Sequence, residues 1–340
     1  KYLLSLFLSL YSISSFCQVD SAEQFNIDSL LQAEFTNMKE LMRVTDKDRS
    51  KLKKMLKRQP NSGETQSFYY IIGLNYFMTD SIARAETIMN DIIKRYPGRC
   101  VYGNAMVTLG EIAARKHDTA KAIKILENYV SDKKMDTLKC EIGETGALFG
   151  DPNVNSKNRA CEALVRIFKA KKNCNKAIAY MDLIRDKYPS NEFCGNGAFA
   201  TTMSSFNDYF EIYMCLKDTA AAIRALLPMI QYDENPFFFA GYYENLHALL
   251  HSKYPASEIE QEVKQALNTI EIGKDIDDAY RTIYITFLGH RFILREHNKY
   301  DYKTNIRVPE EVMLEASREF YSESTFYKEI YKPQLNNVLD

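Results

Sequence analysis

Two kinds of short segment recur along this chain, and their recurrence constrains the fold more than any other feature. One kind carries an apolar pair, a basic residue and Tyr-Pro, and it occurs as IIKRYPGRC at 92–100, LIRDKYPSNEFC at 183–194 and LLHSKYP at 249–255. The other kind occurs as HDTAKAIKIL at 117–126 and KDTAAAIRAL at 217–226. We interpret the first kind as recurring helix ends and the second as recurring helix starts. The sequence therefore predicts an array of repeated helical units.

Four units with matching offsets can be aligned, starting at Gln66, Gly103, Asn158 and Met203. Small residues recur where two antiparallel helices would approach closely. They are Gly73, Gly110, Ala85, Ala122, Ala177 and Ala222. This pattern resembles the tetratricopeptide repeat (TPR) family over about residues 66–236. The resemblance implies helical hairpins that each bury one face against the next, so that several must stack to be stable.

The fold class expected from this resemblance is all-α, a TPR-like solenoid with N-terminal capping helices and a C-terminal helical extension. The expected domains are 1–17 (signal peptide), 18–65 (capping helices), 66–236 (repeat array, with an insertion at 137–157) and 237–340 (C-terminal helices packed on the array). In the last region we expect helices at 256–273, 275–297 and 309–323, because each starts with helix-favouring caps and acids. We find no convincing run of alternating apolar and polar residues that would predict a strand.

The first 17 residues form an apolar run with a basic start and no acid, followed by a polar segment. This pattern predicts a secretory signal peptide that is cleaved before Gln18, with small residues at Ser15 and Cys17. A lipid-modified Cys17 is an alternative, but that site favours a small preceding residue and here it is Phe16. A retained membrane anchor is another, although the run is shorter than the about 20 residues needed to cross a bilayer. We therefore expect an exported, soluble protein in the periplasm or outside a Gram-negative cell.

Six further cysteines lie within one part of the chain: Cys100, Cys140, Cys161, Cys174, Cys194 and Cys215. In an exported protein, an even number of cysteines favours a disulfide framework. Buried free thiols are the alternative. A zinc site is disfavoured because no closely spaced cysteine pair occurs.

The repeat register suggested by the TPR resemblance implies a set of pairings. Cys161 and Cys194 would lie at one edge of the stack, and Cys174 and Cys215 at the opposite edge. Cysteines in register at the ends of stacked helices can just reach one another. We therefore expect the pairs Cys161–Cys194 and Cys174–Cys215, which leaves Cys100–Cys140 to tether the insertion.

Catalytic and cofactor motifs are absent from the sequence: there is no phosphate-binding loop, no dinucleotide fingerprint and no nucleophile elbow. Glu244, His247 and His251 fall on one face of an expected helix and are the alternative hypothesis, a helical metal-dependent enzyme. They lack the arrangement in which a carboxylate lies between the two histidines. We expect no catalytic residues, no metal and no cofactor.

Charge gives no sign of a nucleic-acid or lipid partner, because 44 basic and 45 acidic residues leave a net charge of −1. The aromatic segment 236–246 either packs between the array and the C-terminal helices or forms an exposed patch for a partner. An outer-membrane lipoprotein that captures glycans is a further alternative, which the absence of Trp disfavours.

The favoured hypothesis is a non-catalytic scaffold that binds a peptide or a protein in the concave groove of the array. In the TPR family, defined positions of each first helix face this groove. By that resemblance the candidate binding residues are Tyr70, Phe77, Asn104, Glu111, Arg159, Glu162, Arg166, Lys169, Asn207 and Glu211. The three cations of the third unit would suit an acidic segment or a carboxylate. A solvated helix face explains them equally well.

Overall fold

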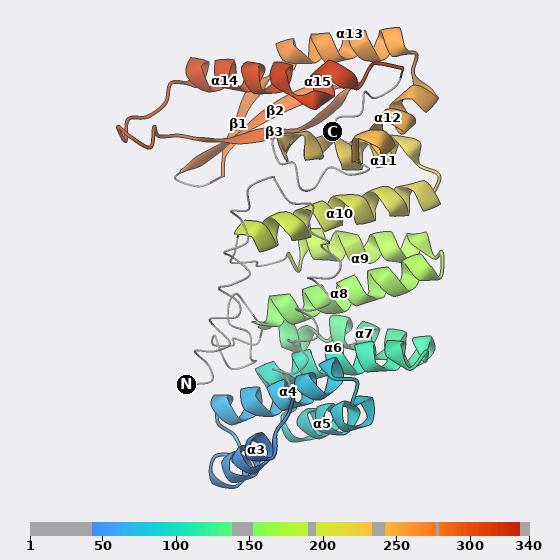
Figure 1. Cartoon of the computed structure of the whole chain (residues 1–340), viewed down its shortest axis with the longest axis vertical. Coiled ribbons are helices and arrows are strands. Elements are labelled where there is room, and N and C mark those ends of the chain that lie inside the picture. The colour runs from blue at the N-terminus through green and yellow to red at the C-terminus, as the bar shows by residue number, and fades with distance from the viewer. Residues whose placement is uncertain (1–42, 138–151, 190–194, 233–241, 277–278, 334–340) are drawn as a thin grey trace, which may run out of the picture.

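The computed structural model describes residues 43–137, 152–189, 195–232, 242–276 and 279–333. Within these ranges the protein is mostly helical and elongated, with helical hairpins stacked along the long axis and a three-stranded sheet near the C-terminal end (Figure 1). The expectations for residues 1–17 and for Cys140 and Cys194 fall outside the described residues.

Four helical hairpins form the stack, as the repeats predicted. Helix α3 (Asp46–Arg58) precedes them, and its start is fixed by Thr45 and Asp48, each of which accepts a hydrogen bond from the other's backbone N–H. The hairpins are α4 (Gly63–Met78) with α5 (Ile82–Arg95), α6 (Cys100–Arg115) with α7 (Thr119–Ser131), α8 (Pro152–Ala170) with α9 (Cys174–Asp186), and α10 (Gly195–Cys215) with α11 (Thr219–Leu226). Short 3₁₀ turns, η2 (Lys133–Thr137) and η3 (Leu227–Tyr232), follow α7 and α11.

The small residues lie where the repeat pattern predicted close contact. The four alanines are fully buried. A Cβ atom added to Gly73 would lie 2.7 Å from side-chain carbons of Ile88 and Met89, and one added to Gly110 would lie 2.6 Å from Leu126. These glycines therefore allow the two helices of a hairpin to approach more closely than any larger residue would.

All four hairpin turns have the same backbone geometry. Asp80, His117, Lys172 and Lys217 each adopt a positive φ between 54° and 61°. In each turn the next residue donates its N–H to the carbonyl five residues earlier, as Asp118 does to Ala113 and Asp218 does to Tyr213. This is the Schellman pattern, which satisfies the last carbonyls of the first helix. Asp118, Asn173 and Asp218 then cap the second helices with their side chains.

The C-terminal part is a mixed α/β unit. Helices α12 (Tyr242–Lys253) and α13 (Ala256–Ala266) with η4 (Leu267–Thr269) lead into strands β1 (Glu271–Asp275), β2 (Tyr280–Phe287) and β3 (His290–Asn298). The strands form an antiparallel sheet in the order β1-β2-β3. Helices α14 (Glu310–Glu323) and α15 (Thr325–Glu329) close the unit, and with α13 they lie along one side of the sheet (Figure 1).

The helix expected at 275–297 is wrong, and the one expected at 256–273 is too long, because the chain forms strands there. Along β2, the side chains of Ile283, Ile285 and Phe287 are buried and alternate with more exposed ones, which is the two-residue period of a half-buried strand. Leu288 and Gly289, with φ of 49° and 75°, form the two-residue turn to β3. Positive φ at both central residues is typical of the tightest hairpins. The helix expected at 309–323 is confirmed by α14.

Three clusters of buried apolar residues follow one another along the molecule. The first joins α3 to the first hairpin and to α6, and the second joins α6 and α7 to the third hairpin. The third includes the fourth hairpin, η3 and the whole α/β unit. Helix α6 contributes to the first two clusters, and α10 contributes Ile212 to the second and Met203 to the third. Each part of the stack is therefore stabilised mainly by its neighbours.

One predicted disulfide is confirmed and one is wrong. Cys174 and Cys215 are bonded, with Cα atoms 6.2 Å apart, and join the third hairpin to the fourth. Cys161 is a free, fully buried thiol in the second core cluster, because its position on α8 faces the core and not the edge of the stack. The predicted pair Cys161–Cys194 is therefore wrong. Cys100 is disulfide-bonded, and its predicted partner Cys140 lies outside the described residues.

Candidate functional site

The first helices of the hairpins share one side of the molecule, and their polar side chains contact one another across the stack. The Tyr70 hydroxyl on α4 lies 3.3 Å from the Thr108 hydroxyl on α6. The Arg159 guanidinium on α8 donates to Glu111 on α6 at 3.3 Å. Lys169, also on α8, forms ion pairs with Asp208 and Glu211 on α10. We call this surface of α4, α6, α8 and α10 the first-helix face.

The contacts of Arg159 and Lys169 favour the charged forms of both side chains. Burial alone would lower the pKa of Arg159, but Tyr70 and Glu111 outweigh it and raise the pKa above its ordinary value. For Lys169, burial likewise lowers the pKa, and hydrogen bonds to Asp208 and Glu211 raise it by more. Both cations therefore stay charged and tie neighbouring hairpins together.

The predicted binding residues differ in how much surface they present. Tyr70, Phe77 and Asn104 are buried, and the Phe77 ring packs under the Arg115 guanidinium at 4.3 Å. Glu111, Arg159, Glu162 and Lys169 are half-buried, whereas Arg166, Asn207 and Glu211 are exposed. Within the described residues, Arg166 has no ion-pair partner. Arg166 is therefore the exposed cation of this face that is available to another molecule.

His247 and His251 have a structural contact that the sequence did not reveal. Their ring centroids are 4.1 Å apart, and their Nε2 atoms lie 2.6 Å and 3.0 Å from the backbone carbonyls of Lys332 and Ile330. A carbonyl only accepts, so each Nε2 donates its proton and cannot also bind a metal. His247 and His251 therefore attach α12 to the chain that follows α15. The described part of the chain contains no group of three or more His, Cys, Asp or Glu side chains placed to hold a metal ion.

The described part of the aromatic segment 236–246 packs into the core. Tyr242 and Leu246 are buried in the third core cluster, and Tyr243 packs against it. Residues 236–241 lie outside the described residues.

A buried lysine lies at the junction of the second and third hairpins, where the sequence predicted an insertion. Lys157 is 1 % exposed, and α8 begins at Pro152, before the expected unit start at Asn158. Its Nζ donates to the carbonyls of Val130 and Asp132 at 3.1 Å and 2.8 Å and forms an ion pair with Asp136. Lys187 also pairs with Asp136, at 2.8 Å. We call Lys157, Asp136 and Lys187 the junction cluster.

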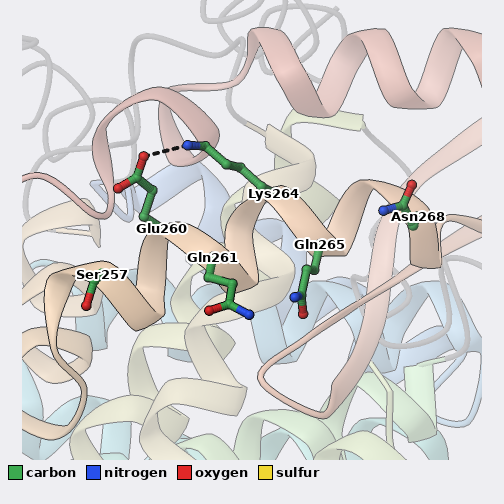
Figure 2. A pocket seen from close by; sticks show the side chains of 6 residues that line it. All are labelled: Ser257, Glu260, Gln261, Lys264, Gln265 and Asn268. Atoms are coloured by element: carbon green, nitrogen blue, oxygen red, sulfur yellow. Dashed lines mark hydrogen bonds and ion pairs between the residues drawn. The ribbon is translucent and has the colours of Figure 1, made fainter.

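A surface depression of about 470 Å³ lies on α13 and η4, lined by Ser257, Glu260, Gln261, Lys264, Gln265 and Asn268. Figure 2 shows that these side chains all come from one helix and its continuation, with Glu260 and Lys264 joined by a hydrogen bond of 2.5 Å. A depression with walls from a single element does not enclose a ligand in the way that binding clefts do.

No helix among the described residues combines the length and the apolar character needed to cross a membrane.

Comparisons with known proteins agree with the hairpin geometry of the first unit. The family described as "Tetratricopeptide repeat" matches residues 68–98. A search of curated proteins found no match. Among solved structures, a chain of the APC/C hetero-tetramer Cut9–Hcn1 is similar, with 17 % identity over 64 % of this chain and 42 % of that chain, and a TM-score of 0.29. The chain thus spans less than half the length of that relative, and a likeness this low carries no argument about function. Residues 68–98, which include most of α4, the whole of α5 and the turn between them, form a tetratricopeptide repeat.

Proposed function

We propose that this chain is an exported, non-catalytic scaffold that binds a peptide or protein partner on its first-helix face. The observation that carries the proposal is the alignment of polar contacts from α4 to α10. Tyr70, Glu111 and Arg159 come from three successive first helices and meet on one side of the stack. The ion pairs of Lys169 extend these contacts to α10, and a face to which four helices contribute suits an extended ligand.

Arg166 is the residue that we expect to contact the partner most directly. Its neighbours Arg159 and Lys169 are held by ion pairs within the protein, so their charges are already balanced. Arg166 is exposed and has no such partner among the described residues. A guanidinium in this setting favours a carboxylate, either an acidic side chain or the C-terminus of a peptide. Export is supported by the apolar segment at 1–17.

A photo-crosslinking amino acid placed on different faces tests the location of the binding surface. We would introduce it at Arg166 and Asn207 on the first-helix face, and at Lys124 and Asn128 on α7 as matched exposed controls. We expect a defined adduct in the native host from the first two positions only. Equal adducts from both sets, or adducts from α7 alone, would contradict the proposal.

The contribution of Arg166 can then be measured with the partner so identified. We expect Arg166→Glu to weaken binding roughly tenfold, as for a charge that contacts an opposite charge across an interface. The free energy of unfolding should change by less than about 0.5 kcal/mol, since the residue is exposed. Lys124→Glu is the control and should leave the affinity unchanged. Isothermal titration and urea unfolding give the two quantities.

A further inference from the structure

Large exposed apolar side chains gather at one end of the C-terminal sheet. Among the described residues this end holds most of those on the surface of the molecule: Ile276, Tyr280, Tyr300, Tyr302, Ile306 and Val312. Tyr302 and Ile306 are 83 % and 66 % exposed. They belong to the segment 299–308 between β3 and α14, which extends beyond the rest of the unit (Figure 1). We call this segment the arm. A group of large exposed apolar side chains in one region is a feature of interaction sites.

The arm is held in one conformation by its own hydrogen bonds. Tyr300 and Arg307 pair as antiparallel strands do, and the Asp301 N–H donates to the Ile306 carbonyl at 2.9 Å. The Asp301 carboxylate accepts from the N–H groups of Lys303 and Thr304 and from the Thr304 hydroxyl. These bonds lower the pKa of Asp301, with the Thr304 N–H contributing most. Because the tip is already ordered, binding through it costs little conformational entropy.

The ends of the arm are anchored in the protein while its tip is not. The Lys299 N–H donates to the Ala279 carbonyl at 2.7 Å, and its buried side chain pairs with Asp275 at 3.2 Å. The Val308 N–H donates back to the Lys299 carbonyl at 2.8 Å. The apolar side chains at the tip therefore point away from the core of their own unit, and another surface is needed to remove them from water.

The charges around this patch suit a second copy of the same chain. Arg281 is neutralised within the protein by Asp275 and Glu310. Arg307 on the arm and Glu311 in the first turn of α14 are both exposed and have no ion pair among the described residues. Lys303 on the arm is a further exposed cation without an ion pair among the described residues, so the patch carries available charges of both signs. In a two-fold symmetric contact, Arg307 of each copy meets Glu311 of the other, so that a single pairing forms twice.

We propose that the chain forms a two-fold symmetric homodimer through the arm and the adjoining end of the sheet. Tyr302 and Ile306 of each copy pack on the apolar patch of the other, and the Arg307–Glu311 pairs flank them. A net charge of −1 leaves little long-range repulsion between copies. This surface is distinct from the first-helix face, so a dimer would present two copies of that face.

Sedimentation velocity of the purified chain tests the dimer. We expect a shift from monomer to dimer between about 1 and 200 µM, as for the weaker interfaces of standard size. Tyr302→Ser combined with Ile306→Ser should weaken the dimer at least roughly 30-fold, the effect of losing hot-spot residues. Ile71→Ser, which removes an exposed apolar side chain from α4, is the matched control and should have no effect.

A charge exchange tests the symmetric arrangement itself. Arg307→Glu and Glu311→Arg should each weaken the dimer roughly tenfold, and the double variant should recover to within about threefold of the original. All substituted side chains are exposed, and thermal unfolding of each variant verifies that it folds. A chain that stays monomeric at all concentrations overturns the proposal. A dimer whose stability is unchanged by the substitutions in the arm overturns it as well. A monomer that binds lipid vesicles through Tyr302 would assign the arm to a membrane surface and would also overturn it.

Discussion

Lys157 places an ammonium group inside the protein, where a charge is stable only if its partners are well arranged. Its three closest partners are two carbonyls near the C-terminal end of α7 and the carboxylate of Asp136. The negative end of the α7 dipole adds to this attraction. The burial of Asp136 by itself raises its pKa, but hydrogen bonds from Lys157 and Lys187 lower it below the ordinary value. The junction cluster thereby holds the second hairpin against the third.

Replacing Lys157 with Met should destabilise the protein by about 3 kcal/mol, because it leaves the carbonyls of Val130 and Asp132 without their donor and removes the buried cation that pairs with Asp136. Lys187→Met is the matched control. It removes the half-exposed partner of the same carboxylate, and we expect it to cost less than about 1 kcal/mol. Urea unfolding followed by circular dichroism at neutral pH gives both values.

The same pair of variants predicts a dependence on pH. Since the pKa of Asp136 is lower in the folded state, its contribution is present above its unfolded value of about 4 and is lost as the pH falls through the folded pKa. The difference in unfolding free energy between the parent and Lys157→Met should therefore shrink below about pH 4. A difference that stays constant down to pH 2 would show that the carbonyls alone hold Lys157.

Sequence reasoning could not place this residue. A segment that breaks the repeat pattern separates Lys157 from Val130, Asp132 and Asp136 in the sequence. Lys187 comes after the end of α9. The small residues at the helix contacts were predictable, by contrast, because Gly110 and Leu126 belong to the same unit and their spacing recurs. The candidate binding residues were intermediate. Their places on the first helices followed from the repeat register, whereas Tyr70 is buried and contacts Thr108 of the next hairpin.

At the scale of elements, the four hairpin turns repeat one backbone conformation, and in two of them it falls on a lysine, a residue that is poorly suited to it. Left-handed φ costs a residue with a Cβ atom about 1 kcal/mol, and glycine avoids most of that cost. Lys172 and Lys217 occupy this position in the third and fourth turns. These turns therefore hold strain that the surrounding helices keep in place.

Substituting glycine at these two turns should raise the stability of the protein. We expect Lys217→Gly to add about 0.5–1 kcal/mol, and the double variant with Lys172→Gly about twice that, seen as a rise of a few degrees in Tm. Lys124→Gly in the middle of α7 is the matched control, where glycine should cost about 1 kcal/mol. A loss of stability at the turns, equal to that in α7, would be inconsistent with the positive φ described here.

The sheet was the element that the sequence analysis missed, and the reason is local. Acids near 275 resemble the start of a helix, which favoured that interpretation. The alternation of Ile283, Ile285 and Phe287 with Thr282, Tyr284 and Thr286 is the signal that would have predicted a strand. Leu288-Gly289 in the middle of the run is the turn between two strands. The repeat pattern gave no help here because it ends before this region.

Across the whole molecule, the three core clusters divide the chain into parts that depend on different contacts. The fourth hairpin shares its core with the sheet, since Ala222 and Leu226 pack in the same cluster as Leu294 and Phe287. The first hairpin belongs to a separate cluster at the other end of the stack. Loss of packing at one end of the stack should therefore destabilise the adjacent helices and strands first.

Hydrogen exchange followed by mass spectrometry can test this division. Leu294→Ala removes a fully buried side chain from β3 and should cost about 2–5 kcal/mol. We expect faster exchange in β2, β3 and α11 and little change in α4 and α5. Ile92→Ala in the first cluster is the matched variant and should give the opposite pattern. If either variant accelerates exchange equally along the whole chain, the protein unfolds as one cooperative unit.

The bond between Cys174 and Cys215 also limits how the molecule responds to a pulling force. The two residues are separated by 41 positions, which include α9 and most of α10. Drawn out fully at about 3.6 Å per residue, that segment would lengthen the chain by about 150 Å. With the sulfurs joined, tension applied at the two ends passes directly across the bond and leaves the enclosed segment slack. The third and fourth hairpins can therefore lose their packing under load while the enclosed segment adds nothing to the end-to-end length of the chain. Only reduction of the disulfide allows that segment to extend.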